Sequence, residues 1–144
     1  MDCPYILEVD DLLIPTGRRI AVAGGPFDFS TEKRVGADIG SVGMGYDHCY
    51  ILADASRNLK PFGEVYDPKS GIMMRMSTTL PAVQFYTGNF LDGSVKCNGF
   101  GRHEGMCFET QFYPDSPNHA DFPSCILKAG DTFHSTTVYA FGVR

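Results

Sequence analysis

Ser77–Gly93 reads STTLPAVQFYTGNFLDG and is the densest run of chemically specified residues in the chain. Pro81 ends one strand, and the β-branched and aromatic residues of Val83–Thr87 favour another strand directly after it. Because side chains alternate across a strand, Gln84 and Tyr86 share one face and apolar residues occupy the other. An amide and a phenol projecting from an apolar wall suit a polyhydroxylated ligand such as a sugar. A core strand whose polar side chains satisfy neighbouring backbone fits the same pattern.

A second strand with polar residues is expected at Cys107–Tyr113, and Pro114 ends it. Alternation places Glu109 on one face with an amide and a phenol, Gln111 and Tyr113. Since phenylalanines stand on either side of it in the strand, we expect Glu109 to be partly desolvated and to act as a base near neutral pH. A glutamate on the solvent-exposed face of a sheet is the alternative.

A third strand is expected at Tyr46–Leu52, with Asp47 and Cys49 on one face and His48 on the other. A carboxylate inside a strand is costly to bury unpaired, so Asp47 is predicted to lie at a polar pocket, at the strand's start or against a cation. The alternative is an aspartate that caps a nearby turn. For His48 we favour a structural role in which it donates to a carbonyl or carboxylate.

Four further segments complete the expected organisation. No segment shows a helical period sustained over a full helix, so the chain is predicted to be all-β, with at most a short helical turn at 30–35. Turn residues predict an early hairpin, a central hairpin and a closing hairpin, separated by a glycine-rich loop. These segments are Leu12–Val22 around Pro15-Thr16-Gly17, Phe62–Ser77 around Asp67–Gly71, Phe122–Val143 around Lys128–Asp131, and the loop Ser94–Gly105.

Composition limits the classes of function. The chain has 144 residues and a mass of 15.8 kDa, which is a one-domain length, and its 43% hydrophobic content with 16 glycines and 9 prolines suits a turn-rich β protein. No apolar run approaches the roughly 18 residues that a membrane span needs. A formal charge of −5 and a pI near 5.2 argue against nucleic-acid binding. A small neutral ligand fits better.

The cysteines and histidines show no metal-site spacing. Five cysteines form no CxxC pair, and an odd number cannot pair completely within one chain, so free thiols in a reducing compartment are expected. The N-terminus lacks the pattern of a secretion signal, which predicts a cytoplasmic location. The four histidines form no HxH or HExxH arrangement, and no metal is predicted. The cysteines are Cys3, Cys49, Cys97, Cys107 and Cys125, and the histidines are His48, His103, His119 and His134.

The run PAVQFYTGNFLDG resembles the signature of the aldose 1-epimerases, the galactose mutarotases. Gly45–His48, with the sequence GYDH, stands upstream, and Phe108–Asn118, with the sequence FETQFYPDSPN, stands downstream, in the family's order and spacing. The resemblance implies an antiparallel β-sandwich of the galactose mutarotase type, with about ten strands present. Family members are usually more than twice this long, so residues 1–144 are expected to be the C-terminal part of a single aldose 1-epimerase-like domain.

The resemblance also implies a mechanism and a set of site residues. Glu109 corresponds to the catalytic base, and Asp47 and Gln84 correspond to residues that bind sugar hydroxyls. The reaction interconverts the α and β anomers of a hexose such as galactose or glucose by acid-base ring opening, and it needs no cofactor. In the family the acid is a histidine from the N-terminal part of the fold, which has no counterpart in these 144 residues.

Other functions remain open at this point. A non-catalytic carbohydrate-binding module, or a decayed fragment, would keep the same sugar pocket without the acid histidine. Asp47 and Glu109 could instead be the paired carboxylates of a glycoside hydrolase, which is the less favoured interpretation. The expected partner is a monosaccharide, with no nucleic acid and no membrane. Missing strands would expose edges and apolar surface, so we also expect self-association or pairing with the missing N-terminal half.

Overall fold

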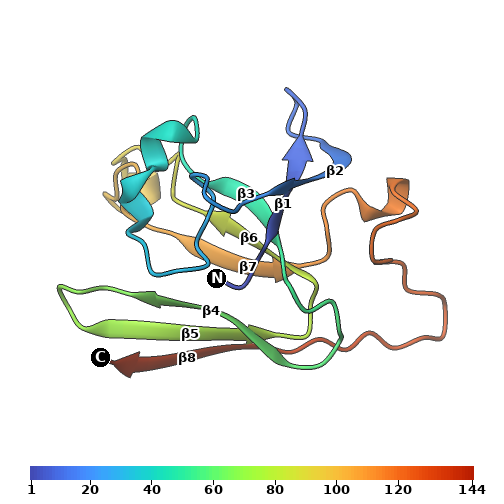
Figure 1. The fold of residues 1–144 in the computed structure, drawn as a ribbon. Coiled ribbons are helices and arrows are strands. Elements are labelled where there is room, and N and C mark those ends of the chain that lie inside the picture. The colour runs from blue at the N-terminus through green and yellow to red at the C-terminus, as the bar shows by residue number, and fades with distance from the viewer.

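The chain forms two antiparallel sheets in a computed structural model that describes residues 1–144, and the three polar strands lie in one of them (Figure 1). One sheet has five strands in the order β2-β1-β3-β6-β7, and the other has three in the order β4-β5-β8. The expected all-β antiparallel sandwich is confirmed, with eight strands rather than about ten. The strands are β1 (Tyr5–Val9), β2 (Pro15–Ala21), β3 (Asp47–Ile51), β4 (Lys60–Tyr66), β5 (Ile72–Thr78), β6 (Ala82–Tyr86), β7 (Cys107–Gln111) and β8 (Thr137–Val143).

Helical structure is limited to four 3-10 turns of three residues each. They are η1 (Val35–Ala37), η2 (Ile39–Ser41), η3 (Val95–Cys97) and η4 (Ser116–Asn118). The short helical turn expected at 30–35 therefore begins at its last residue. No helix has the length and apolarity that crossing a bilayer requires.

The early hairpin differs from its prediction. Pro15 begins β2, so the turn lies at 10–14 rather than at Pro15-Thr16-Gly17. The Asp10 carboxylate accepts hydrogen bonds from the backbone of Leu12 at 2.8 Å and of Ile14 at 2.9 Å. Leu13 takes a positive φ of 63°. The aspartate thus makes the turn through its side chain, an effect that a proline-glycine pattern does not show.

The central hairpin is confirmed, since β4 and β5 pair across the turn at Asp67–Gly71. The predicted closing hairpin is wrong because residues 122–136 contain no strand. β8 instead pairs with β5 over its whole length, from Thr78 opposite Thr137 to Ile72 opposite Val143. β8 thus pairs through seven residues with a strand that is distant in sequence, instead of with the neighbouring segment that the closing hairpin required.

Two hydrophobic clusters lie on opposite faces of the five-stranded sheet. The larger cluster fills the space between the sheets and contains Tyr46, Phe85 and Phe108 together with Met76 of β5. The smaller cluster lies on the outer face, where the segment after β7 packs on the sheet. Its members are Leu7, Cys49, Ile51, Ala82, Tyr113 and Phe122. This segment therefore covers one end of the outer face.

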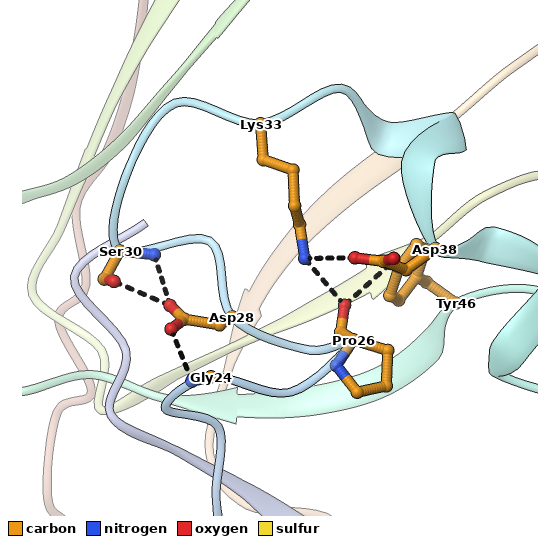
Figure 2. Close-up of polar contacts among 7 residues, drawn as sticks. All are labelled: Gly24, Pro26, Asp28, Ser30, Lys33, Asp38 and Tyr46. Carbon is orange, nitrogen blue, oxygen red and sulfur yellow. Dashed lines mark hydrogen bonds and ion pairs between the residues drawn. The ribbon is translucent and has the colours of Figure 1, made fainter.

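A loop between β2 and β3 closes the inner cluster, and Lys33 organises it (Figure 2). The Lys33 ammonium donates to the Pro26 carbonyl at 3.0 Å and to the Asp38 carboxylate at 2.9 Å. It also lies 4.5 Å from the centre of the Phe29 ring. The Tyr46 hydroxyl donates to the same Pro26 carbonyl at 2.8 Å, which ties the loop to the start of β3.

Asp28 holds the other side of this loop, as Figure 2 shows. Its carboxylate accepts from the Ser30 hydroxyl at 2.6 Å, the Ser30 backbone at 2.9 Å and the Gly24 backbone at 2.9 Å. These hydrogen bonds, the Ser30 hydroxyl first, lower the pKa of Asp28 from 3.8 to about 2. The ionised form is therefore favoured in the folded protein.

This geometry predicts a pH-dependent effect of Asp28→Ala. Because the folded pKa is depressed, the contribution of Asp28 to stability is present above pH 3.8 and is lost as the pH falls toward 2. The variant should have a lower Tm than the parent near neutral pH, and the difference should close toward pH 2. Thermal unfolding across this range measures the difference, with Asp11→Ala, at an exposed aspartate, as the control. A difference that persists undiminished at the acid end would contradict the prediction.

Candidate functional site

The structure brings the three predicted site residues together on the outer face of the five-stranded sheet. Asp47 comes from β3, Gln84 from β6 and Glu109 from β7. Gln84 is opposite Glu109, and Asp47 is opposite Tyr86, two residues further along β6. Since positions two apart share a face, all of these side chains project on the same side. They occupy the end of that face that the outer cluster leaves open.

A direct hydrogen bond links two of the three. The Gln84 amide nitrogen donates to the Asp47 carboxylate at 2.8 Å. The Gln84 amide oxygen is buried and has no partner, and reversing the amide would place that oxygen against the carboxylate. Asp47 therefore orients the amide. The aspartate itself pairs with an amide rather than with a cation.

Glu109 is exposed, so the expected partial desolvation is wrong for this structure. Its neighbour Phe108 is buried between the sheets, on the face opposite the carboxylate. Strand alternation thus turns the flanking aromatic ring away from Glu109. Phe108 therefore does not desolvate the Glu109 carboxylate.

His48 lies on the opposite face of the sheet from Glu109. Its ring packs against Phe27 with centroids 4.6 Å apart, and its Nδ1 accepts a hydrogen bond from the Asp47 backbone at 3.0 Å. Burial lowers the pKa of His48 from 6.5, which favours the neutral ring at neutral pH. His48 thus has a structural environment, and it accepts a backbone hydrogen bond where the sequence suggested that it donates one.

The turn after β6 fixes where β3 begins. The Tyr46 carbonyl accepts from the Thr87 backbone and from the Asn89 amide, each at 3.1 Å. The Tyr46 backbone donates to the Thr87 hydroxyl at 3.0 Å. Gly45 has a φ of 123°, and a Cβ there would lie 2.9 Å from that hydroxyl. The Thr-Gly-Asn sequence therefore anchors the strand that presents Asp47.

Tyr86 and Cys107 lie beside Asp47 on the same face of the sheet. Tyr86 stands between Asp47 and Cys107 in the register, and its hydroxyl accepts from the Phe90 backbone at 3.1 Å. Burial first, and then the nearby Glu109 and Asp47 carboxylates, raise the pKa of the Cys107 thiol. The thiol is therefore held protonated. Cys107 was not among the predicted site residues, although its spacing of two from Glu109 on one strand was a signal.

No metal site or disulfide contributes to this surface. All five cysteines are free, and no group of three His, Cys, Asp or Glu side chains is placed to hold a metal ion. The surface offers two carboxylates, an oriented amide and a phenol. Such a set can accept and donate hydrogen bonds to several hydroxyl groups, and an exposed carboxylate can accept a proton.

The spacing of Asp47 and Glu109 disfavours a retaining glycoside hydrolase. β6 separates β3 from β7, and the register offsets Asp47 and Glu109 by two positions along the strands. Two inter-strand spacings across the sheet and two residue rises along it put their backbones about 12 Å apart. A retaining hydrolase holds its two carboxyl groups about 5 to 5.5 Å apart. In addition, Asp47 is already engaged by Gln84.

Comparison with known proteins identifies relatives along almost the whole chain. The sequence profile of the family described as Aldose 1-epimerase matches residues 4–140. A galactose mutarotase from Bos taurus is 39% identical over 147 residues, a match that covers 99% of this chain and 43% of the relative. An aldose 1-epimerase from Escherichia coli is 33% identical over 144 residues, covering 94% of this chain and 42% of the relative.

The fold has a solved counterpart. A GalM/aldose epimerase homologue from C. elegans superimposes with a TM-score of 0.82 at 26% identity, over 99% of this chain and 44% of that structure. The chain thus spans about two fifths of the length of the proteins that it matches.

Proposed function

Because the chain belongs to the aldose 1-epimerase family, we propose that it carries the general-base side of a site that interconverts the α and β anomers of a hexose such as galactose or glucose. The observation that carries the proposal is the alignment of Asp47, Gln84 and Glu109 on one open face, with the amide oriented by the aspartate. It supports binding of sugar hydroxyls by Asp47 and Gln84, with Glu109 as the catalytic base.

In the proposed reaction Glu109 removes the proton from the anomeric hydroxyl. The ring oxygen receives a proton as its bond to the anomeric carbon breaks. Rotation of the open-chain aldehyde and reclosure, with the proton transfers reversed, give the other anomer. Positioned acid and base groups suffice for this reaction, so the proposal includes no cofactor.

The acid is proposed to come from outside these 144 residues. His48 faces away from Glu109. The His119 ring stacks on Phe122, which belongs to the cluster at the covered end of the sheet. Since the match covers only about two fifths of the relatives' length, we propose that the chain is the C-terminal part of a single epimerase domain whose remaining part supplies the proton donor.

Exposed apolar side chains on β8 support the proposal that the chain is part of a larger domain. Tyr139, Phe141 and Val143 alternate on the face that carries the buried Met76, yet they are 42%, 72% and 81% exposed. The five-stranded sheet ends at β7, so no further strand covers them. We propose that the N-terminal half of an epimerase fold, or a second copy of this chain, covers this surface. The cytoplasmic location stays a prediction.

A non-catalytic carbohydrate-binding module is the second candidate. The exposed face offers acceptors and donors for hydroxyl groups, and His48, the histidine next to the site in sequence, points to the other face. A surface with a base and no acid would bind the sugar without interconverting its anomers.

Polarimetry of freshly dissolved α-galactose tests the proposal. The samples are the chain alone, the chain mixed with the part of the bovine relative that the match leaves uncovered, and that part alone. We expect only the mixture to exceed the buffer rate, with the chain alone binding galactose in an NMR titration. Catalysis by the chain alone would overturn the proposal that the acid comes from outside these 144 residues.

Two other results separate the candidates. Galactose binding without catalysis in a mixture that forms a stable complex would favour the binding module, and no binding at all would overturn both. Sedimentation of the chain alone, expected to show self-association, and of the mixture gives the state of assembly.

A further inference from the structure

Two side chains of β8 contact β7 on either side of Glu109. The Tyr139 hydroxyl donates to the carbonyl of Phe108 at 2.6 Å. The Thr137 hydroxyl lies 2.5 Å from the hydroxyl of Thr110. Phe108 and Thr110 are the residues directly before and after Glu109, so these β7–β8 contacts bracket the glutamate.

These contacts matter because β7 is an edge strand. It pairs with β6 and has no strand on its other side, so the main-chain ladder holds it from one side alone. The β7–β8 contacts reach it from the three-stranded sheet. They hold the inner side of the strand whose outer side presents Glu109.

The second sheet gives the contacts a rigid base. The Thr137 hydroxyl lies 3.2 Å from the hydroxyl of Thr78, which is fully buried on β5. Tyr139 is opposite Met76, which is also fully buried. Burial first, and then the nearby Glu109 carboxylate, raise the pKa of Tyr139, so its hydroxyl remains a donor across neutral pH.

We propose that Tyr139 and Thr137 are positioning residues for Glu109. They hold the backbone of β7, so that the Glu109 carboxylate keeps the position and orientation that proton transfer needs. The inference rests on the proposed function of Glu109. A catalytic group displaced by about 1 Å can lose about 100-fold in rate, so an unsupported edge strand would be a poor platform for a base.

The test combines one readout that needs activity with one that does not. The variants are Tyr139→Phe and Thr137→Val, which remove one hydroxyl each, Thr137→Ser, which keeps it, and Tyr5→Phe as the control. Tyr5 lies on β1 and is 42% exposed, the same fraction as Tyr139. Hydrogen exchange of the β7 amides is measured on the chain alone, and kcat and KM for mutarotation on the chain with the complementing part.

For Tyr139→Phe and Thr137→Val we expect exchange of the β7 amides to speed up about 10-fold, and kcat to fall about 10-fold while KM stays within about 2-fold. Thr137→Ser and Tyr5→Phe should match the parent. Unchanged β7 exchange would overturn the inference whatever the activity. Faster exchange with an unchanged kcat would show that the contacts support the strand without positioning the base.

The experiments distinguish a failure of the proposed function from a failure of the positioning role. If the parent mixture is assembled and inactive, the catalytic role of Glu109 falls and the positioning role falls with it. If the parent is active and Glu109→Gln is inactive, the β7 exchange and the kcat of the Tyr139 and Thr137 variants together decide the inference.

Discussion

Glu109→Gln is expected to lower the rate of galactose mutarotation by about 1000-fold in the assembled protein, the range that loss of a general base produces. Glutamine keeps the size of the side chain and can still hydrogen bond to a hydroxyl, but it cannot take the anomeric proton. KM should therefore change little while kcat falls. Polarimetry with the complementing part present measures both values.

Glu64→Gln is the matched control for this variant. Glu64 is another exposed strand glutamate, but it lies on β4 of the other sheet and pairs with Arg75 at 2.9 Å. It should retain the parent rate. If Glu109→Gln retained the parent rate as well, Glu109 would not be the base. A shared loss in both variants would point to a general effect of removing strand carboxylates.

Phe85→Ala is expected to destabilise the chain by about 3 to 5 kcal/mol, the cost of deleting a buried aromatic ring from a packed core. Phe85 is 1% exposed. Its ring stacks on Phe108 at 4.8 Å and on Tyr46 at 5.3 Å, and it meets Phe29 edge-on at 5.7 Å. These partners belong to β7, to the residue before β3 and to the loop that closes the core. The deletion therefore leaves a cavity where all three meet.

Urea unfolding of Phe85→Ala beside Phe141→Ala measures this effect. Phe141 is also a strand phenylalanine, but it is 72% exposed, so its truncation should change the free energy of unfolding by less than about 0.5 kcal/mol. Equal losses in the two variants would contradict the burial that the structure assigns. A gain in solubility for Phe141→Ala would agree with its place on the uncovered apolar surface of β8.

The sequence alone was sufficient for the all-β class, the central hairpin and the faces of the polar strands. Period-two alternation is a local property, so it placed Gln84 and Tyr86 on one side of β6 and Glu109 on one side of β7 correctly. The turn at Asp67–Gly71 was equally local, because proline and glycine set its backbone geometry.

Tertiary structure decided which distant strands pair and which side chains other parts of the chain cover. The pairing of β8 with β5 joins residues about sixty to seventy positions apart in the sequence, and no local pattern selects it over a closing hairpin. The exposure of Glu109 depends on what lies over its face rather than on its neighbours in sequence.

The site itself shows the division. Strand alternation, a local rule, determined which way Asp47, Gln84 and Glu109 point. Their assembly into one surface, with Asp47 bonded to Gln84 and His48 turned away, required the order and register of β3, β6 and β7. Register between distant strands is set by the packing of the whole core, which is why only the tertiary structure could decide it.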